Sequence, residues 1–285
     1  YPFCTLITRS FFSNKTAGFT FENYIRFFTK KYYYSALGRS LFVSIVTTCT
    51  TLLVGVPIAY IMSRYNVFGK SFIHIFIIMS LMSPPFIGAY SWIMLFGRAG
   101  FVTRLFANIG IHLPSIYGKL GIILVFTFKL FPYVYLYTSG AMGSIDSSIE
   151  EAAENLGSNK LRRLLTITLP VVAPSIAAGA IMVFMTSLAD FGTPMLIGEG
   201  YRTFTVEIYK QFLSETGSDY GFASAISVIA IVLTAAIFLL QKYATKKFSF
   251  TMNALHPVEK KEARGLSGFL MHAYCYILVA IAFMP

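Results

Sequence analysis

The chain has 285 residues, of which 56% are hydrophobic and only 12% are charged. A soluble domain carries about 25% charged residues, so this composition leaves too little polar surface to face water on all sides. The formal net charge of +11 does not predict nucleic-acid binding, because the Lys and Arg residues lie between apolar runs instead of clustering on one face.

Long stretches without any Asp, Glu, Lys or Arg divide the sequence. They lie at 40–63, 71–97, 164–189, 220–241 and 265–285. Each is about 20 residues or longer, which is the length that an α-helix needs to cross a hydrocarbon core of about 30 Å. The backbone must satisfy its own hydrogen bonds in lipid, and the sequence lacks the alternating pattern of a membrane barrel. An all-α, polytopic bundle of transmembrane helices is therefore predicted.

In chain order, residues 1–39 are interpreted as the end of a first transmembrane helix, up to about Phe12, followed by an external loop. Residues 40–245 form the predicted core domain, with complete spans at 40–63, 71–97, 119–141, 167–189 and 221–241. Residues 246–265 are interpreted as a cytoplasmic linker and 266–285 as the start of a further helix. Both ends lie in apolar runs, which suits one period of a longer, duplicated protein; an arbitrary truncation is the alternative.

The orientation of the bundle is not fixed by counting basic residues, because the two sides carry nearly equal numbers of Lys and Arg. One cluster favours a side, since it directly follows a predicted span, as cytoplasmic segments do. It consists of Lys242, Lys246, Lys247, Lys260, Lys261 and Arg264. We therefore expect 142–166 and 242–265, which lie on the same side of the predicted bundle, to face the cytoplasm.

The most charged short segment is 150–170, EEAAENLGSNKLRRLLTITLP, which lies between two predicted spans. Acidic residues come first and basic residues follow, an order that suits the two ends of a helix dipole. Gly157 is expected to break the helix, and Pro170 to stand in the first turn of the next span. The pattern predicts a short surface helix, a glycine bend and re-entry into the membrane.

This segment resembles the EAA loop of binding-protein-dependent ABC importer permeases. The family pattern is EAA, three residues, Gly, nine residues and I-x-L-P, and every gap agrees here. The residues that the resemblance assigns to ATPase coupling are Glu151, Ala152, Ala153, Glu154, Gly157, Ile167, Leu169 and Pro170. In that family the loop forms a coupling helix that docks on a cytoplasmic ATPase, so 142–166 is interpreted as a coupling loop.

The resemblance extends over about 1–245. The segment 19–28, followed by 40–44, looks like the external loop and first core helix of these permeases. The segment 188–212 is similar to the branch that includes ferric-iron, polyamine and phosphonate-type permeases. The resemblance implies a type I, MetI-like fold and a multi-pass protein of the bacterial inner membrane. Ferric iron is the favoured cargo, because permeases of that kind are often two fused halves; polyamine and aminoethylphosphonate are the alternatives.

The resemblance also implies the partners. These are a cytoplasmic ABC ATPase dimer that binds ATP and Mg, an extracytoplasmic substrate-binding protein, a second permease half (fused or separate) and the lipid bilayer. The chain itself is expected to be no enzyme and to hold no cofactor. Gly69-Lys70-Ser71 ends like a phosphate-binding loop, but Arg64 stands where the required earlier glycine would be.

Two charged residues are candidates for the translocation path. Lys129 lies near the middle of the 119–141 span, where a lysine costs roughly 2.5–3.5 kcal/mol, so it should face the bundle interior, a water-filled path or a carboxylate. Structural pairing or a shifted span boundary are the alternatives. Asp190 ends a long uncharged run. It is interpreted either as lining the outer mouth of the path or as an ordinary helix-end carboxylate. Pro84-Pro85 should kink or break the 71–97 span.

Other classes of function find little support in the sequence. The four histidines share no ligand spacing, so no metal site is predicted, and no catalytic constellation appears. A secondary transporter without an ATPase is the rival from another class. It would need carboxylates inside the membrane for ion coupling, and the sequence supplies almost none.

Overall fold

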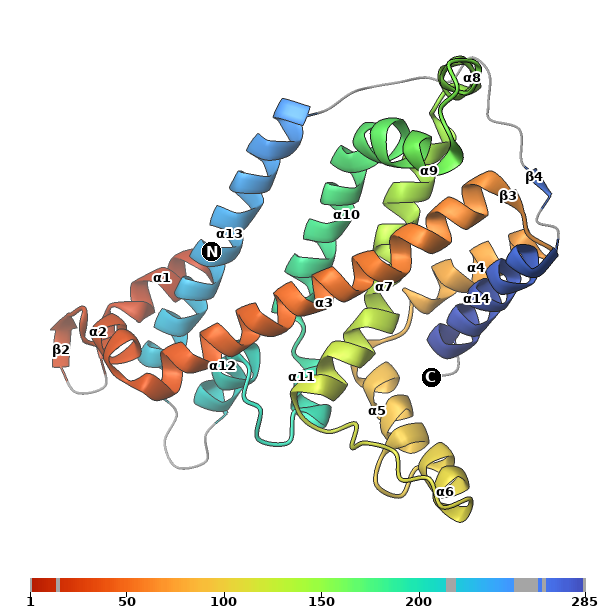
Figure 1. Cartoon of the computed structure of the whole chain (residues 1–285). Coiled ribbons are helices and arrows are strands. Elements are labelled where there is room, and N and C mark those ends of the chain that lie inside the picture. The colour runs from red at the N-terminus through yellow and green to blue at the C-terminus, as the bar shows by residue number, and fades with distance from the viewer. Residues whose placement is uncertain (1, 14–15, 214–218, 249–260, 263–264, 284–285) are drawn as a thin grey trace.

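The computed structural model describes residues 2–13, 16–213, 219–248, 261–262 and 265–283. In this part of the chain, five helices are long and apolar enough to cross a membrane. They are α3 (Lys31–Arg64), α7 (Lys119–Gly143), the continuous helix Lys160–Ala189, α13 (Tyr220–Phe248) and α14 (Gly265–Phe283). The prediction of an all-α transmembrane bundle is confirmed (Figure 1).

Shorter elements connect these helices. The continuous helix Lys160–Ala189 consists of α9 (Lys160–Arg163), the π-helical turn η1 (Leu164–Thr168) and α10 (Leu169–Ala189). The other described helices are α1 (Pro2–Ser10), α2 (Glu22–Thr29), α4 (Lys70–Ser80), α5 (Pro85–Phe96), α6 (Phe101–Asn108), α8 (Ser147–Asn155), α11 (Gly192–Ile197) and α12 (Phe204–Phe212). Two short strand pairs are antiparallel β1 (Phe12–Ser13) with β2 (Thr16–Phe19) and parallel β3 (Tyr65–Asn66) with β4 (Lys261–Glu262).

The predicted span 71–97 is not one helix. α4 ends at Ser80 and α5 begins at Pro85. Pro84 is extended, with ψ of 142°, because the following proline ring disfavours the helical conformation of the residue before it. Pro85 stands in the first turn of α5, where an N–H group would have no helical partner in any case. The helix is therefore broken at the two prolines, which confirms the expected kink or break at Pro84-Pro85.

The predicted external loop 13–39 contains helical structure. It contains all of α2, and α3 begins at Lys31, nine residues before the predicted span at 40. A helix of 34 residues is roughly 51 Å long, well over the ~30 Å hydrocarbon core. The uncharged stretch 40–63 is therefore only part of this helix.

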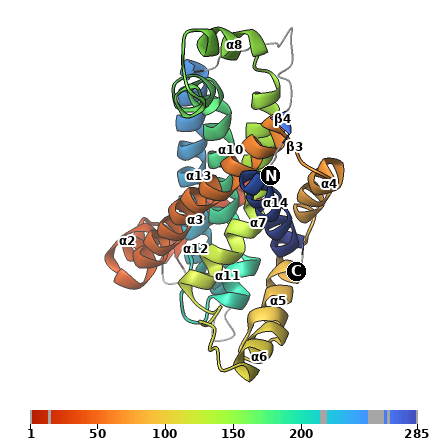
Figure 2. The same ribbon diagram turned by 45° about the vertical axis from the view of Figure 1, so that its right-hand side comes forward.

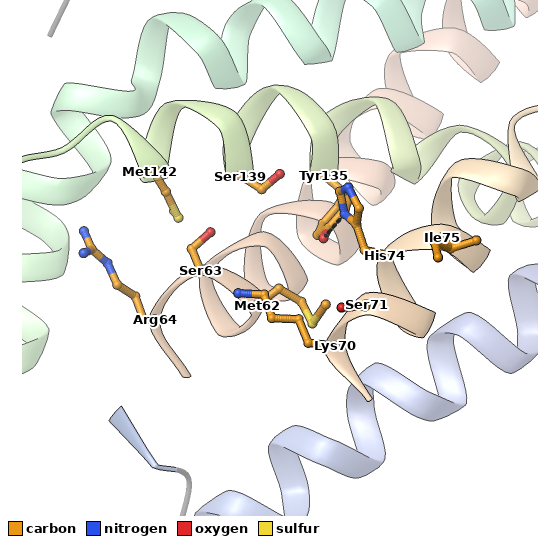
Figure 3. A pocket seen from close by; sticks show the side chains of 11 residues that line it. Met62, Ser63, Arg64, Lys70, Ser71, His74, Ile75, Tyr135, Ser139 and Met142 are labelled. Carbon is orange, nitrogen blue, oxygen red and sulfur yellow. Dashed lines mark hydrogen bonds between the residues drawn. The ribbon is translucent and has the colours of Figure 1, made fainter. Parts of the chain in front are cut away.

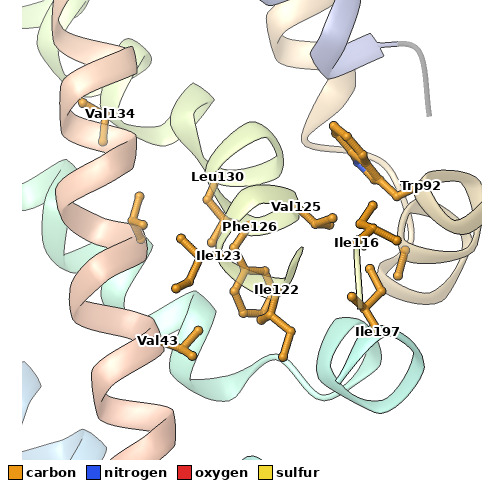
Figure 4. Packing of buried hydrophobic residues seen from close by; sticks show 12 residues of the cluster. Val43, Trp92, Ile116, Ile122, Ile123, Val125, Phe126, Leu130, Val134 and Ile197 are labelled. Atoms are coloured by element: carbon orange, nitrogen blue, oxygen red, sulfur yellow. The ribbon is translucent and has the colours of Figure 1, made fainter. Parts of the chain in front are cut away.

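Three helices form the centre of the bundle. α3, α7 and α10 pack on one another, and glycines allow their backbones to approach closely. A Cβ on Gly55 of α3 would lie 2.7 Å from the Cβ of Val134 on α7, and one on Gly179 of α10 would lie 3.2 Å from the Cα of Val134. A hydrophobic cluster from α3, α5, α7, α10 and α11 fills the space below this crossing (Figure 4).

The two ends of the bundle differ. Figures 1 and 2 show α8 lying across one end, where α7 finishes and α10 is entered, while α6, α11 and α12 lie at the opposite end. The C-terminal end of α13 points to the same end as α8. This arrangement suits the expected common side for 142–166 and the residues after 242, although most of the 246–265 linker lies outside the described residues.

Candidate functional site

The 142–166 loop contains a helix with a complete cap at each end. The side chain of Asp146 accepts a hydrogen bond from the backbone N–H of Ser148 (3.0 Å) at the start of α8. At the other end Gly157 has φ of +79°, a left-handed conformation that glycine adopts without strain. The N–H groups of Gly157 and Ser158 donate to the carbonyls of Glu154 and Ala153 (2.9 and 3.0 Å), which is a Schellman motif. The predicted glycine bend is therefore present.

Glu150 joins α8 to the bundle. Its carboxylate forms an ion pair with Arg64, the last residue of α3, and the side chain of Arg64 is only 8% exposed. The hydroxyl of Thr168, the last residue of η1, donates to the same carboxylate (Oγ1 to Oε1, 3.1 Å). One carboxylate thus ties the surface helix to the end of α3 and to the entry into α10.

Arg163 makes a second link between the two arms of the loop. It pairs with Glu154 of α8, and its Nη1 also donates to the backbone carbonyl of Glu150 (3.5 Å). The acidic and basic residues of 150–163 therefore lie on two helices, and the interpretation of one helix with complementary ends is wrong. The cations stand at the start of a helix, where its dipole is unfavourable, so the ion pair with Glu154 compensates for that position.

The outward face of the loop carries exposed residues of mixed character. Glu151 and Ala152 are exposed, Ala153 is half-buried, and two leucines are strongly exposed: Leu156 at 88% and Leu161 at 65%. The loop lies on the surface of the bundle (Figure 2). It therefore offers a contact surface on which two exposed leucines stand among polar and charged residues.

The I-x-L-P residues lie where the chain enters the bundle. Leu169 packs against a buried cluster that contains Met142, Ile145 and Val172. The continuous helix starts at Lys160 rather than at the predicted 167, and Pro170 stands in the first turn of its α10 part, as predicted. Pro170 lacks an N–H and its ring crowds the preceding turn, and the wider π turn η1 stands directly before it.

Beside the Arg64 anchor lies a cavity of about 560 Å³ between the end of α3, the start of α4 and the end of α7 (Figure 3). Polar and apolar side chains line it together, and its wall contains the hydrogen bond between His74 Nδ1 and the Tyr135 hydroxyl (2.8 Å). Arg64 thus contributes to the wall of this cavity as well as to the tether of α8. A change in the position of α8 would act directly on this wall.

The second candidate site brings Lys129 and Asp190 together. Lys129 Nζ donates to Asp190 Oδ2 at 2.6 Å, and the Asp190 side chain is only 5% exposed. Asp190 caps the end of α10, and its Oδ1 accepts from the backbone N–H of Thr193 in α11 (2.9 Å). The hydroxyl of Thr205 donates to the Asp190 backbone carbonyl (3.0 Å). The pair therefore connects the middle of α7 to the junction between α10 and α11.

Two cavities meet at this pair. The larger, about 940 Å³, lies between α7, α10, α13 and the break after α4, and is lined by both Lys129 and Asp190. The smaller, about 340 Å³, lies between α4, α5, α7 and α14. Lys129 and Ser83 line both cavities, so the broken helix and the buried lysine stand at the boundary between them. Irregular backbone at membrane depth is tolerated where it borders a cavity, as it does here.

The sequence had identified some of these residues and missed others. It had singled out Lys129 and Asp190 separately, and the structure pairs them. It did not identify Glu150, Arg64 and Thr168 as a unit, because the tether depends on which acidic residue of α8 faces the bundle. The helical spacing offered a partial signal, since Glu150 and Glu154 are four residues apart and share a face. In the described residues, no group of three or more His, Cys, Asp or Glu side chains is arranged to hold a metal ion.

Comparison with known proteins adds a family assignment. Residues 55–250 match the family described as "Binding-protein-dependent transport system inner membrane component". The chain is 29% identical over 247 residues to the putative ferric transport system permease protein FbpB 1 of Haemophilus influenzae; the match covers 85% of this chain and 38% of that protein. It is also 29% identical over 219 residues to the molybdenum transport system permease protein ModB of the same species, covering 75% of this chain and 93% of ModB.

The fold has known counterparts as well. The chain superimposes with a TM-score of 0.72 on a chain of the bacterial alginate ABC transporter, solved in complex with an alginate pentasaccharide-bound periplasmic protein. That match covers 88% of this chain and 89% of the other at 16% identity, so it supports the fold alone. The chain spans little more than a third of the length of its ferric transport relatives.

Proposed function

Because the chain belongs to the family of binding-protein-dependent transport system inner membrane components, we propose that it is a permease subunit of an ATP-driven importer. It is a multi-pass protein of the inner membrane with the type I permease fold. In the proposal it forms half of a translocation path, a second permease half completes it, and an extracytoplasmic binding protein delivers the cargo. A separate cytoplasmic ATPase dimer binds ATP and Mg and drives the cycle.

The loop around α8 carries this proposal. Its inner face is fixed to α3 and to the entry of α10 through Glu150, and its outer face presents Leu156, Leu161 and Glu151. A surface that is joined to two central helices and carries exposed leucines among charged residues on its free side suits a lever that a partner moves. An ATP-driven movement of that partner would bias the bundle between two arrangements.

Ferric iron is the proposed cargo. Ferric transport permeases align with more of this chain than the molybdenum relatives do, 85% against 75%. Molybdate is the second candidate, because the ModB relative is equally identical and is matched over nearly its whole length. Polyamine and aminoethylphosphonate remain alternatives from the resemblance of 188–212.

A secondary transporter is less well supported. Ion coupling needs a carboxylate that can take up and release a proton or a cation inside the membrane. Asp190 is a buried carboxylate at the end of α10. Both of its oxygens already accept hydrogen bonds, one from Lys129 and one from the Thr193 N–H. ATP-independent uptake into vesicles would favour this rival.

The docking surface can be tested by adding charge to it. Leu156→Asp or Glu151→Lys in the full-length protein should abolish co-purification of the ATPase and ATP-dependent uptake of ⁵⁵Fe(III) or ⁹⁹Mo-molybdate in proteoliposomes. Leu156 is 88% exposed, so the folded bundle should be unaffected. Leu213→Asp is the matched control, because Leu213 is also exposed (61%) but follows α12 at the opposite end. Normal ATPase binding and uptake by both loop variants would contradict the proposal.

A further inference from the structure

The Lys129–Asp190 pair lines the larger cavity, and its carboxylate has both oxygens bound whereas its ammonium keeps unused donors. Asp190 uses one oxygen for Lys129 and the other for the Thr193 N–H, and only 5% of its side chain is exposed. The lysine ammonium has three N–H donors, of which Asp190 accepts one. No other bond of Lys129 Nζ is present in the described part of the chain, and 18% of its side chain is exposed. Two N–H donors of the ammonium therefore remain to bind a molecule that enters the cavity.

The rest of the cavity wall matches this character. Asp190 is the only carboxylate among the described residues that line it. The polar groups on the wall besides the ion pair are hydroxyls, from Ser83, Tyr133, Tyr137, Thr186 and Thr234. Hydroxyls and an ammonium can all donate to oxygen acceptors, whereas a cationic cargo would find a single carboxylate that is already neutralised.

The position of Lys129 places these donors where a cargo would pass. Lys129 and Ser83 line both the 940 Å³ and the 340 Å³ cavity, beside the break between α4 and α5. A lysine at this depth is costly to insert and is usually retained for a function, although pairing alone can also satisfy it. The exposed donors and the shared position on two cavities distinguish this pair from a buried pair that only joins two helices.

We propose that Lys129 is the cargo-contacting cation of the translocation path and that the cargo passes as an oxygen-rich anion or anionic complex. This inference rests on the proposed importer function and specifies its cargo class. Asp190 is a positioning residue: it holds the ammonium at the cavity wall and itself makes no contact with the cargo. A ferric ion would pass in an anionic oxygen-ligand complex, and molybdate would pass as the oxyanion; a polyamine would be repelled by Lys129.

The test uses the full-length importer with its ATPase and binding protein in proteoliposomes. The probes are ⁵⁵Fe as ferric citrate, ⁹⁹Mo-molybdate and ¹⁴C-spermidine. The main variant is the double substitution Lys129→Met with Asp190→Asn, which removes both charges and leaves neither one buried alone. Lys129→Arg is the conservative control that keeps the cation. Co-purification of the ATPase and the melting temperature report whether each variant assembles.

Wild type is expected to import at least one of the two anionic probes and not spermidine. The double variant should assemble normally, and its uptake rate should fall by about tenfold or more because one charge-assisted hydrogen bond to the cargo is lost. The uptake rate of Lys129→Arg should stay within a few-fold of wild type. Wild-type uptake by an assembled double variant, or ATP-dependent uptake of spermidine, would overturn the inference and leave the importer function standing. Failure of wild type to import either anionic probe with ATP would overturn the inference, and failure of wild type to bind the ATPase would overturn the importer function as well.

Discussion

Replacing Glu150 by Gln removes the charge that holds Arg64. The Arg64 side chain is 8% exposed and that of Glu150 is 21% exposed, so the variant leaves a largely buried guanidinium without its counter-ion. Breaking a fully buried pair costs about 3–5 kcal/mol. Water reaches a fifth of Glu150, which lowers the expected cost of opening the α8 loop to about 2–3 kcal/mol.

Hydrogen exchange of the 147–168 amides in nanodiscs measures this cost directly. At about 1.4 kcal/mol for each factor of ten, the loss corresponds to exchange roughly 30 to 150 times faster in Glu150→Gln. Glu151→Gln is the control, because Glu151 carries the same charge on the exposed side of the same helix. Its amides should exchange within about twofold of wild type, as surface substitutions usually do.

Arg64→Met, Glu150→Met and the double variant Arg64→Met, Glu150→Met form a thermodynamic cycle with the wild type. Replacing both partners by apolar side chains should restore most of the lost protection, because no buried charge is then left unpaired. Exchange in Glu150→Gln that matches Glu151→Gln would refute the tether. Strict additivity in the cycle would also show that Glu150 and Arg64 do not act as a pair.

Three further substitutions test local features, with heat resistance in detergent and amide exchange as measurements. Gly55→Ala should destabilise the protein by about 1–3 kcal/mol, since the new Cβ would lie 2.7 Å from that of Val134. Gly140→Ala is the control: its Cβ would meet open space, so it should be neutral or slightly stabilising. Equal stability of the two variants would argue against the close crossing of α3 and α7. Gly157→Ala should cost about 1 kcal/mol through its φ of +79° alone, because nothing lies within 4 Å of the added Cβ, and Gly157→Asn should cost less. Asn159→Ala should cost about 1 kcal/mol and speed exchange in the first turn of α9, where Asn159 is the N-cap; unchanged exchange there would exclude a stabilising cap.

The sequence predicted the presence of the long apolar helices better than their bounds. An uncharged run indicates a segment suited to lipid, and a helix can continue on either side of it. Lys31 and Lys160 therefore begin helices that the charge pattern placed at 40 and 167. The break at Pro84-Pro85 was predictable as a possibility, because adjacent prolines have a direct effect on the backbone.

The candidate sites show a different limit. The free-energy cost of a charged side chain in or beside a membrane span was enough to single out Lys129 and Asp190. Their pairing across 61 positions depends on how α7 and α10 pack. In the acidic run, Glu150 and Glu151 have the same chemistry, and only the rotation of α8 on the bundle decides that Glu150 faces inward. The resemblance identified the loop and not the residue that fixes it.

The helix from Lys160 to Ala189 carries both sites, one near each end. Thr168 binds the Glu150 carboxylate where the helix enters the bundle, and Asp190 holds Lys129 where it ends. The 22 residue steps from Thr168 to Asp190 span roughly 33 Å at 1.5 Å per residue, about the thickness of the hydrocarbon core. The π turn η1 adjoins the first site, so it is the place where the helix can absorb a displacement of α8 by rearranging its hydrogen bonds. A displacement that η1 does not absorb must move α10 as a unit, and with it the carboxylate that positions Lys129.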